Sequence, residues 1–140
     1  TRFMSWKAHR AIEDTRAFLR FAVESWEREG VGTYLIEHDG AVIGSTGLHP
    51  DAPGRAETGY ILRRDAWHKG YATEVCRAMI ELAPTLGFVR VQAHCFVEHD
   101  ASARVLEKAG MTFEGVLRKH TVLPNLSPVP QDMRLFARVW

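Results

Sequence analysis

A cluster of basic residues surrounds a glycine at the point where a strand pattern changes into a helix pattern. The apolar segment Thr58–Leu62 leads into the cationic turn Arg63–Lys69, and Gly70 precedes a long amphipathic segment. The first N–H groups of a helix have no acceptor within the helix and lie at the positive end of its dipole, so they can bind an anion. Gly70 lets the backbone approach a bulky ligand, and the small Ala72 keeps that approach clear. The arrangement predicts a site for a phosphate or diphosphate.

Two interpretations of this turn remain open from its residues alone. In one, Arg63, Arg64 and Lys69 bring positive charge to the anion, and His68 acts as a donor when it is protonated. In the other, Gly70 only turns the chain and the basic residues form a solvated rim. The chain has neither the Gly-x-x-x-x-Gly-Lys-Ser/Thr pattern of a P-loop nor a Gly-x-Gly-x-x-Gly pattern after a strand, which excludes both of those phosphate motifs.

A second segment decides between them, because the two segments together resemble one known family. The Gly-Tyr-Ala-Thr-Glu segment that begins at Gly70 resembles the coenzyme A pyrophosphate loop of the GNAT acetyltransferases. Trp67 stands where most members have Gln or Arg, and it is familiar in their RimJ/RimL-like branch. The segment Phe96–Met111 is similar to the family's Asn-x-x-Ser-x-x-x-Leu-Glu-Lys-x-Gly-Phe pattern, with His99 in place of Asn and Met111 in place of Phe.

The resemblance implies catalytic and cofactor-binding residues. Ser102 is the expected donor to the departing thiolate; its alternative role is to cap the N-terminus of its helix. Glu57, on the strand beside the cofactor, is expected to take the amine proton directly or through water. Backbone N–H groups near Ile61–Arg63 are expected to polarise the thioester carbonyl. The expected contacts to acetyl-CoA, the co-substrate, are Ile61, Leu62, Arg63, Arg64, His68, Lys69, Gly70, Tyr71, Ala72, Thr73, His99 and Ser102.

Length and composition limit the chain to one small unit. Its 140 residues and 46% apolar content fit a single domain with a sizeable core, and no internal repeat or linker divides it. The formal net charge of +1 gives no support for nonspecific binding to nucleic acid or membrane. No run of about 18 apolar residues and no signal-like segment occurs, so a soluble cytoplasmic protein is the default expectation.

Cysteine and histidine are spaced unfavourably for metal or thiol chemistry. Cys76 falls in a predicted helix and Cys95 in a predicted strand, without partners at metal-ligand spacing, which favours a reduced setting. His94 and Cys95 are neighbours on a strand, so their side chains point to opposite faces and do not form a nucleophilic pair. The seven histidines include no His-x-x-x-His pair, so no metal site is predicted. His120 begins a loop near the presumed acceptor side and is a candidate substrate contact.

Three helices are predicted from apolar residues at three- and four-residue steps. They span about Ala11–Glu29, about Gly70–Leu86 and Ala101–Ala109. Gly30, Gly87 and Gly110 follow their C-terminal ends, where glycine commonly caps a helix. The apolar stripe of the first helix consists of Ile12, Phe18, Leu19, Ala22, Val23 and Trp26.

Six strands are predicted from the remaining apolar segments. They span Gly32–His38, Ala41–His49, Ala56–Leu62, Val89–Phe96, Thr112–Lys119 and Asp132–Val139, and Pro50–Gly54 and Thr121–Gln131 are predicted loops. Asp39-Gly40 favours a type I′ turn between the first two strands. The long helix between the third and fourth strands predicts that those two run parallel through a right-handed crossover. In the resembling family this pair splays apart and pantetheine enters the gap.

The expected fold class is therefore α/β (α+β), with a GNAT-type mixed, mostly antiparallel sheet flanked by helices and containing a splayed parallel strand pair. The resemblance covers about Ala11 to the end, and we expect residues 1–140 to form a single GNAT acetyltransferase domain. Members of the family begin with a strand before the first helix, and here only Arg2–Trp6 is left to supply one. The chain starts at Thr1 without a methionine, so we expect that first strand to be absent or degenerate and leave open that residues precede it.

The expected reaction is direct transfer of an acetyl group from acetyl-CoA to a primary amine. An α-amine with a pKa of about 8 is roughly a tenth neutral at pH 7, whereas a lysine near 10.4 is neutral in less than about one part in a thousand. A protein or peptide N-terminus therefore needs the least help and is the leading acceptor. The alternatives are a small-molecule amine such as an antibiotic or polyamine, a non-catalytic acyl-CoA-binding module, and a plain oligomerisation scaffold. A homodimer is left open.

Overall fold

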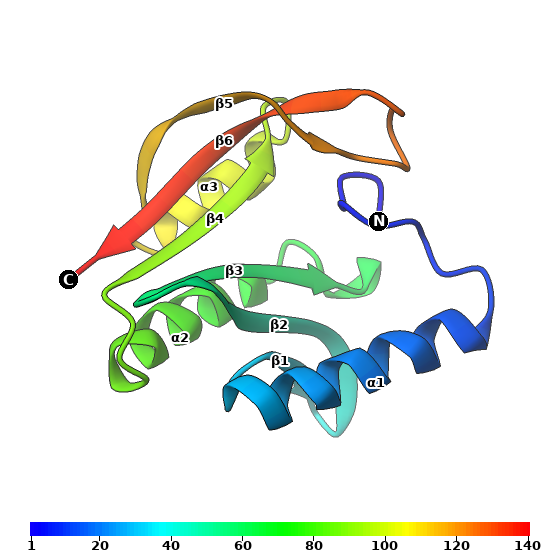
Figure 1. The fold of residues 1–140 in the computed structure, drawn as a ribbon. Coiled ribbons are helices and arrows are strands. Elements are labelled where there is room, and N and C mark those ends of the chain that lie inside the picture. Colours follow the sequence, from blue (N-terminus) through cyan, green and yellow to red (C-terminus); the bar gives the residue numbers. More distant parts are fainter.

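A six-stranded sheet with helices on both faces forms the protein, and the computed structural model describes residues 1–140 (Figure 1). In chain order the elements are α1 (Ile12–Glu29), β1 (Thr33–His38), β2 (Ala41–Ala52), β3 (Arg55–Leu62), the short 3-10 helix η1 (Arg64–Ala66), α2 (Tyr71–Thr85), β4 (Arg90–Phe96), α3 (Asp100–Lys108), β5 (Thr112–Val122) and β6 (Pro130–Val139). The strand order is β1-β2-β3-β4-β6-β5, and only β3 and β4 run parallel. The predicted mixed, mostly antiparallel sheet is confirmed.

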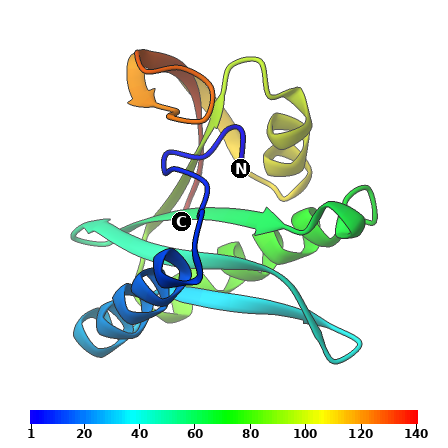
Figure 2. The same cartoon turned by 90° about the vertical axis from the view of Figure 1, so that its right-hand side faces the viewer.

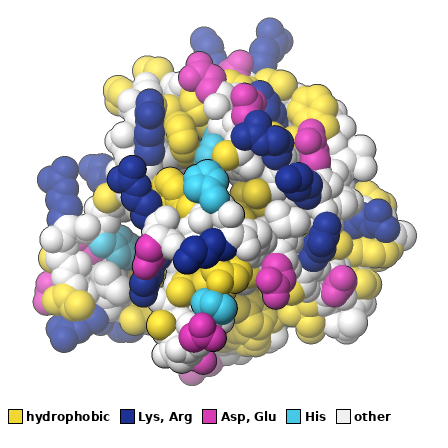
Figure 3. Space-filling view, turned by 180° about the vertical axis from the view of Figure 1, so that it is seen from behind, with side chains coloured by type: hydrophobic (Ala, Val, Ile, Leu, Met, Phe, Trp, Pro, Cys, Tyr) yellow, Lys and Arg dark blue, Asp and Glu magenta, His cyan; other side chains and the backbone are white.

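The helices lie on opposite sides of the sheet. Figure 2 shows α1 on one side and α2 with α3 on the other, and we call these sides the α1 face and the α2/α3 face. Viewed from the α2/α3 face, the surface carries many Lys and Arg side chains with Asp and Glu side chains between them (Figure 3). The α2/α3 face therefore presents charges of both signs to anything that approaches it.

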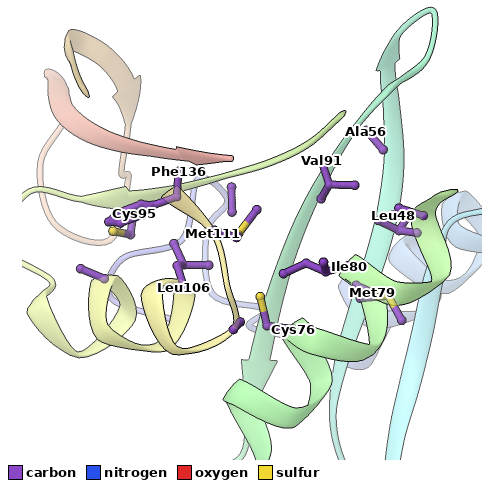
Figure 4. Packing of buried hydrophobic residues seen from close by; sticks show 14 of the residues in the cluster. Leu48, Ala56, Cys76, Met79, Ile80, Val91, Cys95, Leu106, Met111 and Phe136 are labelled. Carbon is purple, nitrogen blue, oxygen red and sulfur yellow. The ribbon is translucent and has the colours of Figure 1, made fainter. Parts of the chain in front are cut away.

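The main hydrophobic core lies between the sheet and the helices α2 and α3. Figure 4 shows apolar side chains from both helices pointing toward those of the strands. Cys76 from α2 and Leu106 from α3 are buried against strand residues such as Leu48, Val91 and Phe136. Because apolar residues recur every three to four positions in the helices and every second position in the strands, these faces meet without burying charge.

Most predicted elements agree with the structure to within one residue, but three strand ends are wrong. β2 runs through Ala52, because its ladder with β3 continues past a bulge between Pro50 and Ala52. The predicted loop at residues 50–54 therefore shrinks to a short turn. β5 extends to Val122 and β6 begins at Pro130, so the predicted loop at residues 121–131 is reduced to 123–129. Pro130 is tolerated because it is the first residue of its strand.

The predicted turn and helix ends are confirmed. Asp39 and Gly40 have φ angles of 51° and 74°, as both central residues of a type I′ turn require. Gly87 and Gly110 follow the last turns of α2 and α3. Phe88 follows Gly87, and its N–H donates to the Ala83 carbonyl at 3.1 Å. This bond gives a carbonyl in the last turn of α2 a hydrogen-bond donor.

The first helix forms as predicted, but its apolar stripe is mostly exposed. Only Ala22 and Ser25 of α1 are buried, whereas Ile12 is 62% and Val23 57% exposed. Contact with the sheet is concentrated at the C-terminal end of the helix. There the Trp26 ring meets Tyr34 edge to face at 5.0 Å, and its Nε1 donates to the Thr33 carbonyl at 2.8 Å. The amphipathic spacing correctly predicted that this segment is helical. The expectation that its apolar stripe is buried is wrong for most of the stripe.

Residues 1–10 form no strand and lie between the β5–β6 loop and α1 (Figure 2). The side chain of Asn125 holds them in place. Its Nδ2 donates to the carbonyls of Thr1 and Trp6, both at 2.8 Å, and its Oδ1 accepts from the Ala8 N–H at 3.0 Å. One side chain in a loop thus fixes three backbone groups of the N-terminal segment.

We expect the fold to lose stability at alkaline pH. Burial raises the pKa of Cys76 to about 12, of Cys95 to about 11 and of Tyr60 to about 12, against ordinary values of 9.0 for the thiols and 10.0 for the phenol. The folded state therefore keeps these protons after the unfolded chain has lost them. This contribution to stability is fully present below pH 9.0 and disappears as the pH rises toward 12. Urea midpoints across that range test it, Cys76→Ala should flatten the decline, and a constant midpoint up to pH 11 would contradict it.

Candidate active site

The parallel strands β3 and β4 are joined at one end only. Arg55, Ala56 and Glu57 pair with the first three residues of β4, the last of which is Gln92, and no pairing continues beyond them. Figure 1 shows the two strands diverging from that end. The sheet is therefore open between the later residues of both strands, and the predicted splayed pair is confirmed.

The backbone N–H groups of β3 face this opening at alternate residues. The Arg63 N–H donates to the Ile43 carbonyl on the β2 side at 2.8 Å. Because the direction alternates along a strand, the Ile61 N–H also faces β2, whereas those of Tyr60 and Leu62 face the opening. The prediction that the N–H groups of Ile61–Arg63 polarise the thioester carbonyl is therefore wrong for Ile61 and Arg63, whose N–H groups face β2. The Leu62 N–H remains as a donor.

The N-terminus of α2 has the features expected of an anion site. Gly70 has a φ angle of 89°, and a Cβ atom placed on it would meet nothing within 4 Å. The N–H groups of Thr73 and Glu74 donate to the Gly70 carbonyl, whereas those of Tyr71 and Ala72 have no acceptor in the protein. Two free donors therefore point away from the helix start into open space, and the site fits a phosphate group.

The basic residues of the turn differ in their partners. Arg63 binds the carboxylate of Asp65, its Nε lying 3.1 Å from Oδ1, and this contact raises the pKa of Arg63 and lowers that of Asp65. Part of the charge of Arg63 is thus neutralised within the protein. Arg64, His68 and Lys69 are exposed and have no ion-pair partner. Of the predicted cationic contacts, these three remain available to a ligand.

Two contacts that the sequence did not predict hold the turn in place. The Nε1 of Trp67 donates to the Leu62 carbonyl at 3.0 Å, which fixes the end of β3. The hydroxyl of Tyr71 lies 2.8 Å from Nε2 of His38, which joins the first turn of α2 to the end of β1. The free N–H groups of the helix are thereby kept in register with the end of β3.

Ser102 lies at the opening from the α2/α3 side, where Tyr60 reaches it from β3. The two hydroxyl oxygens are 3.0 Å apart. Burial raises the pKa of Tyr60 to about 12, so the phenol keeps its proton at neutral pH. The N-cap of α3 is His99 rather than Ser102, so the alternative role of Ser102 as a helix cap is wrong. Sequence reasoning missed Tyr60; its position in strand β3, on the same face as Thr58, was the available signal.

Glu57 and His94 meet on the opposite side of the sheet. Glu57 is three residues from Tyr60 along β3, so the two side chains point to opposite faces. Nδ1 of His94 lies 3.1 Å from Oε1 of Glu57, and the histidine side chain is 11% exposed against 46% for the glutamate. The ring of His120 packs with its centroid 5.1 Å from that of His94. The expected proton acceptor and the candidate substrate contact are thus joined through a histidine to which no role was assigned.

His99, which was predicted to contact the cofactor, is packed against the N-terminal segment. Its ring packs against Phe3 of the N-terminal segment, with centroids 4.4 Å apart. Burial lowers the pKa of His99 despite the nearby charge of Asp100. The imidazole is therefore held neutral at the start of α3.

Neither a metal centre nor a membrane-spanning helix is found. No group of three or more His, Cys, Asp or Glu side chains is placed to hold a metal ion. No helix is both long and apolar enough to cross a bilayer. The free thiols of Cys76 and Cys95 are buried.

A sheet opened between two parallel strands, with a helix N-terminus and free N–H groups beside the opening, defines the fold of an acyl-CoA-dependent transferase. Residues 1–112 match the model of the acetyltransferase (GNAT) domain, and the chain belongs to this family. It is an N-acetyltransferase that uses acetyl-CoA as co-substrate. The family resemblance of the two sequence segments is confirmed.

Two curated relatives come from Bacillus. The chain is 32% identical over 125 residues to the uncharacterized N-acetyltransferase YoaA of Bacillus subtilis (strain 168), covering 86% of this chain and 71% of YoaA. It is 33% identical over 89 residues to the uncharacterized N-acetyltransferase p20 of Bacillus licheniformis, covering 61% of this chain and 50% of p20. The chain thus spans only part of both relatives.

Solved structures with the same fold include enzymes for different acceptors. The microcin C7 self-immunity acetyltransferase MccE, solved with acetyl-CoA and AMP, has a TM-score of 0.86 at 23% identity, covering 99% of this chain and 77% of MccE. The RimL ribosomal L7/L12 α-N-protein acetyltransferase, solved with coenzyme A, has a TM-score of 0.81 at 22% identity, covering 92% of this chain and 73% of RimL. The branch indicated by Trp67 is thus represented among these structures.

Proposed function

We propose that this N-acetyltransferase acetylates the α-amino group of a protein or peptide. The main support for this proposal is that two pairs of polar side chains flank one opening in the sheet from opposite faces. Tyr60 and Ser102 lie on the α2/α3 face, 3.0 Å apart, and Glu57 and His94 lie on the α1 face, 3.1 Å apart. A hydroxyl pair suits a departing thiolate, and a carboxylate–imidazole pair suits an incoming amine.

The residues of the α2/α3 face fit the acetyl-CoA side of this reaction. The free N–H groups of Tyr71 and Ala72, with Arg64 and Lys69 nearby, would hold the pyrophosphate. The Leu62 N–H would donate to the thioester carbonyl and favour attack on its carbon. Tyr60, which keeps its proton, would donate to the Ser102 oxygen and leave the serine proton for the sulfur.

The residues of the α1 face fit the amine side. The carboxylate of Glu57 adds negative charge where an amine must lose a proton, and it is partly open to solvent. An α-amine is already neutral in roughly a tenth of molecules at pH 7, so a base of modest strength is enough. RimL, named as an α-N-protein acetyltransferase, provides a precedent for this acceptor on the same fold. The buried free thiols fit a reducing, cytoplasmic setting.

A small-molecule amine is the second candidate acceptor. What supports it is that MccE, named as a microcin C7 self-immunity acetyltransferase, has the same fold as this chain. Because both identities are below a quarter, the shared fold does not choose between the two acceptors.

An acceptor panel tests the proposal. The protein is incubated with acetyl-CoA and peptides that begin with Ser or Ala, with the same peptides blocked at the N-terminus but carrying an internal lysine, and with a polyamine and an aminoglycoside. Thiol release is measured and products are identified by mass spectrometry. We expect acetylation of the free α-amine and none of the blocked peptides. Turnover of the small amines alone would favour the second candidate. Saturable acetyl-CoA binding without thiol release would instead support a non-catalytic module, and no binding at all a scaffold.

A further inference from the structure

The contact between Glu57 and His94 determines where the imidazole carries its proton. An ionised carboxylate can only accept hydrogen bonds, so Nδ1 of His94, which lies 3.1 Å from Oε1 of Glu57, must be the protonated nitrogen. In a neutral imidazole with a proton on Nδ1, the lone pair is on Nε2. His94 therefore presents a basic nitrogen on the side of the ring that faces away from Glu57.

The place of His94 in the sheet puts the residue beside the opening. Gln92 is the last residue of β4 paired with β3, and His94 is two residues further, on the diverging part and on the same face. Glu57 is still within the paired part. His94 is thus nearer to the opening along the chain, and Glu57 lies behind it.

We propose that Nε2 of His94 takes the proton from the acceptor amine and that Glu57 is a positioning residue that fixes the tautomer of His94. This inference rests on the proposed function and specifies its amine side. Glu57 then acts through the histidine and does not itself accept the proton.

The groups around the pair are two further imidazoles and an apolar residue. His49 faces Glu57 across the β2–β3 ladder, and His120 packs on the His94 ring from β5. On β6, the residue opposite His94 is Leu135, which has no charge. Glu57 is therefore the only carboxylate that contacts His94, and its charge stabilises the imidazolium when the proton arrives.

The proton transfer balances without another reactant. His94 takes one proton from the amine nitrogen as that nitrogen forms its bond to the acetyl carbon. The electron pair of the broken carbon–sulfur bond stays on sulfur, which is protonated from the Ser102 side. His94 then returns its proton to solvent, and the exposed edge of Glu57 keeps the pair in contact with water.

A spectroscopic experiment tests the tautomer in the free protein. Two-bond ¹⁵N–¹H spectra of protein labelled at histidine, compared with His94→Gln for assignment, should show the proton of neutral His94 on Nδ1. Glu57→Gln keeps an oxygen acceptor and should keep this tautomer, whereas Glu57→Ala should release it. A proton on Nε2 of His94 in the unaltered protein would overturn the proposal whether or not the protein is active.

A kinetic experiment tests the proton transfer with a peptide that has a free α-amine. We expect His94→Gln to lower kcat by about tenfold, at the low end of general-base effects because an α-amine needs little help, with little change in the KM for acetyl-CoA. Added imidazole should restore part of the activity of His94→Gly. His9→Gln is the matched control, because His9 is exposed on the N-terminal segment and bonds only to Thr15.

The outcomes separate this proposal from the proposed function. Acetylation of the peptide with unchanged kcat in His94→Gln would overturn the role of His94 and leave the function standing. Loss of activity with a lowered melting point and no rescue by imidazole would make His94 structural. Absence of peptide acetylation by the unaltered protein would overturn the proposed function itself.

Discussion

Gly70→Asp is expected to weaken acetyl-CoA binding by more than about a hundredfold, equivalent to roughly 2.7 kcal/mol, while the fold survives. The new carboxylate would lie at the start of α2, in the space toward which the Tyr71 and Ala72 N–H groups are free. It would occupy the position of the pyrophosphate and repel it. The fold should tolerate the change, because a Cβ at this position meets nothing within 4 Å and Asp is among the residues that best accept a positive φ.

A neutral substitution isolates the charge. Gly70→Asn has nearly the same shape and the same backbone cost as Gly70→Asp, so the difference between the two variants in titration calorimetry reports the added charge. Lys69→Ala should weaken binding much less, by under about 1 kcal/mol, because an exposed ion pair contributes little. Unchanged affinity in Gly70→Asp, with an unchanged melting point, would place the pyrophosphate elsewhere.

Ser102→Ala is expected to lower kcat by about tenfold to a hundredfold with little change in the KM for acetyl-CoA. The hydroxyl acts on charge that develops on sulfur only as the bond breaks, so its loss affects the transition state more than binding. General-acid contributions are typically on the order of 10²–10⁴-fold. The low end applies here because a thiol with a pKa near about 8.5 leaves readily without help.

The melting point of Ser102→Ala distinguishes a catalytic role of Ser102 from a structural one. Ser102 is inside α3 and does not cap it, and the only hydrogen-bond partner of its hydroxyl is Tyr60. Alanine should therefore leave the melting point nearly unchanged. Tyr60→Phe removes the partner but keeps the serine, and we expect a smaller fall in kcat than for Ser102→Ala. A lower melting point with unaltered kcat in Ser102→Ala would remove Ser102 from the chemistry.

Local patterns were enough to predict the scaffold around the opening. The strand, basic turn, glycine and helix from β3 into α2 depend on short-range periodicity and on the conformations that glycine allows, and all appear where expected. The strand ends failed because ladders with a neighbouring strand continued through prolines that marked a loop locally. The splay came from the family resemblance, since no local pattern shows where two strands stop pairing.

The site itself was only half visible in the sequence. The sequence indicated Ser102 and Glu57 but not their partners. Tyr60 is 42 positions from Ser102, and His94 is 37 positions from Glu57, so no local pattern relates the members of either pair. Strand periodicity does show that Tyr60 and Glu57 point to opposite faces. It does not show which side chain of another element meets them, which depends on how α3 and β4 cross the opening.

The position of the opening has a consequence for how the two substrates interfere with one another. The hydroxyl pair and the carboxylate–imidazole pair lie on opposite faces of a sheet, so the donor and the amine are expected to arrive from different sides and to be bound at the same time. Product coenzyme A should then compete with acetyl-CoA but not with the amine in inhibition kinetics. For the same reason, substitutions that change which amines are accepted can accumulate on the α1 face without altering affinity for the donor, so one scaffold can acquire new acceptors.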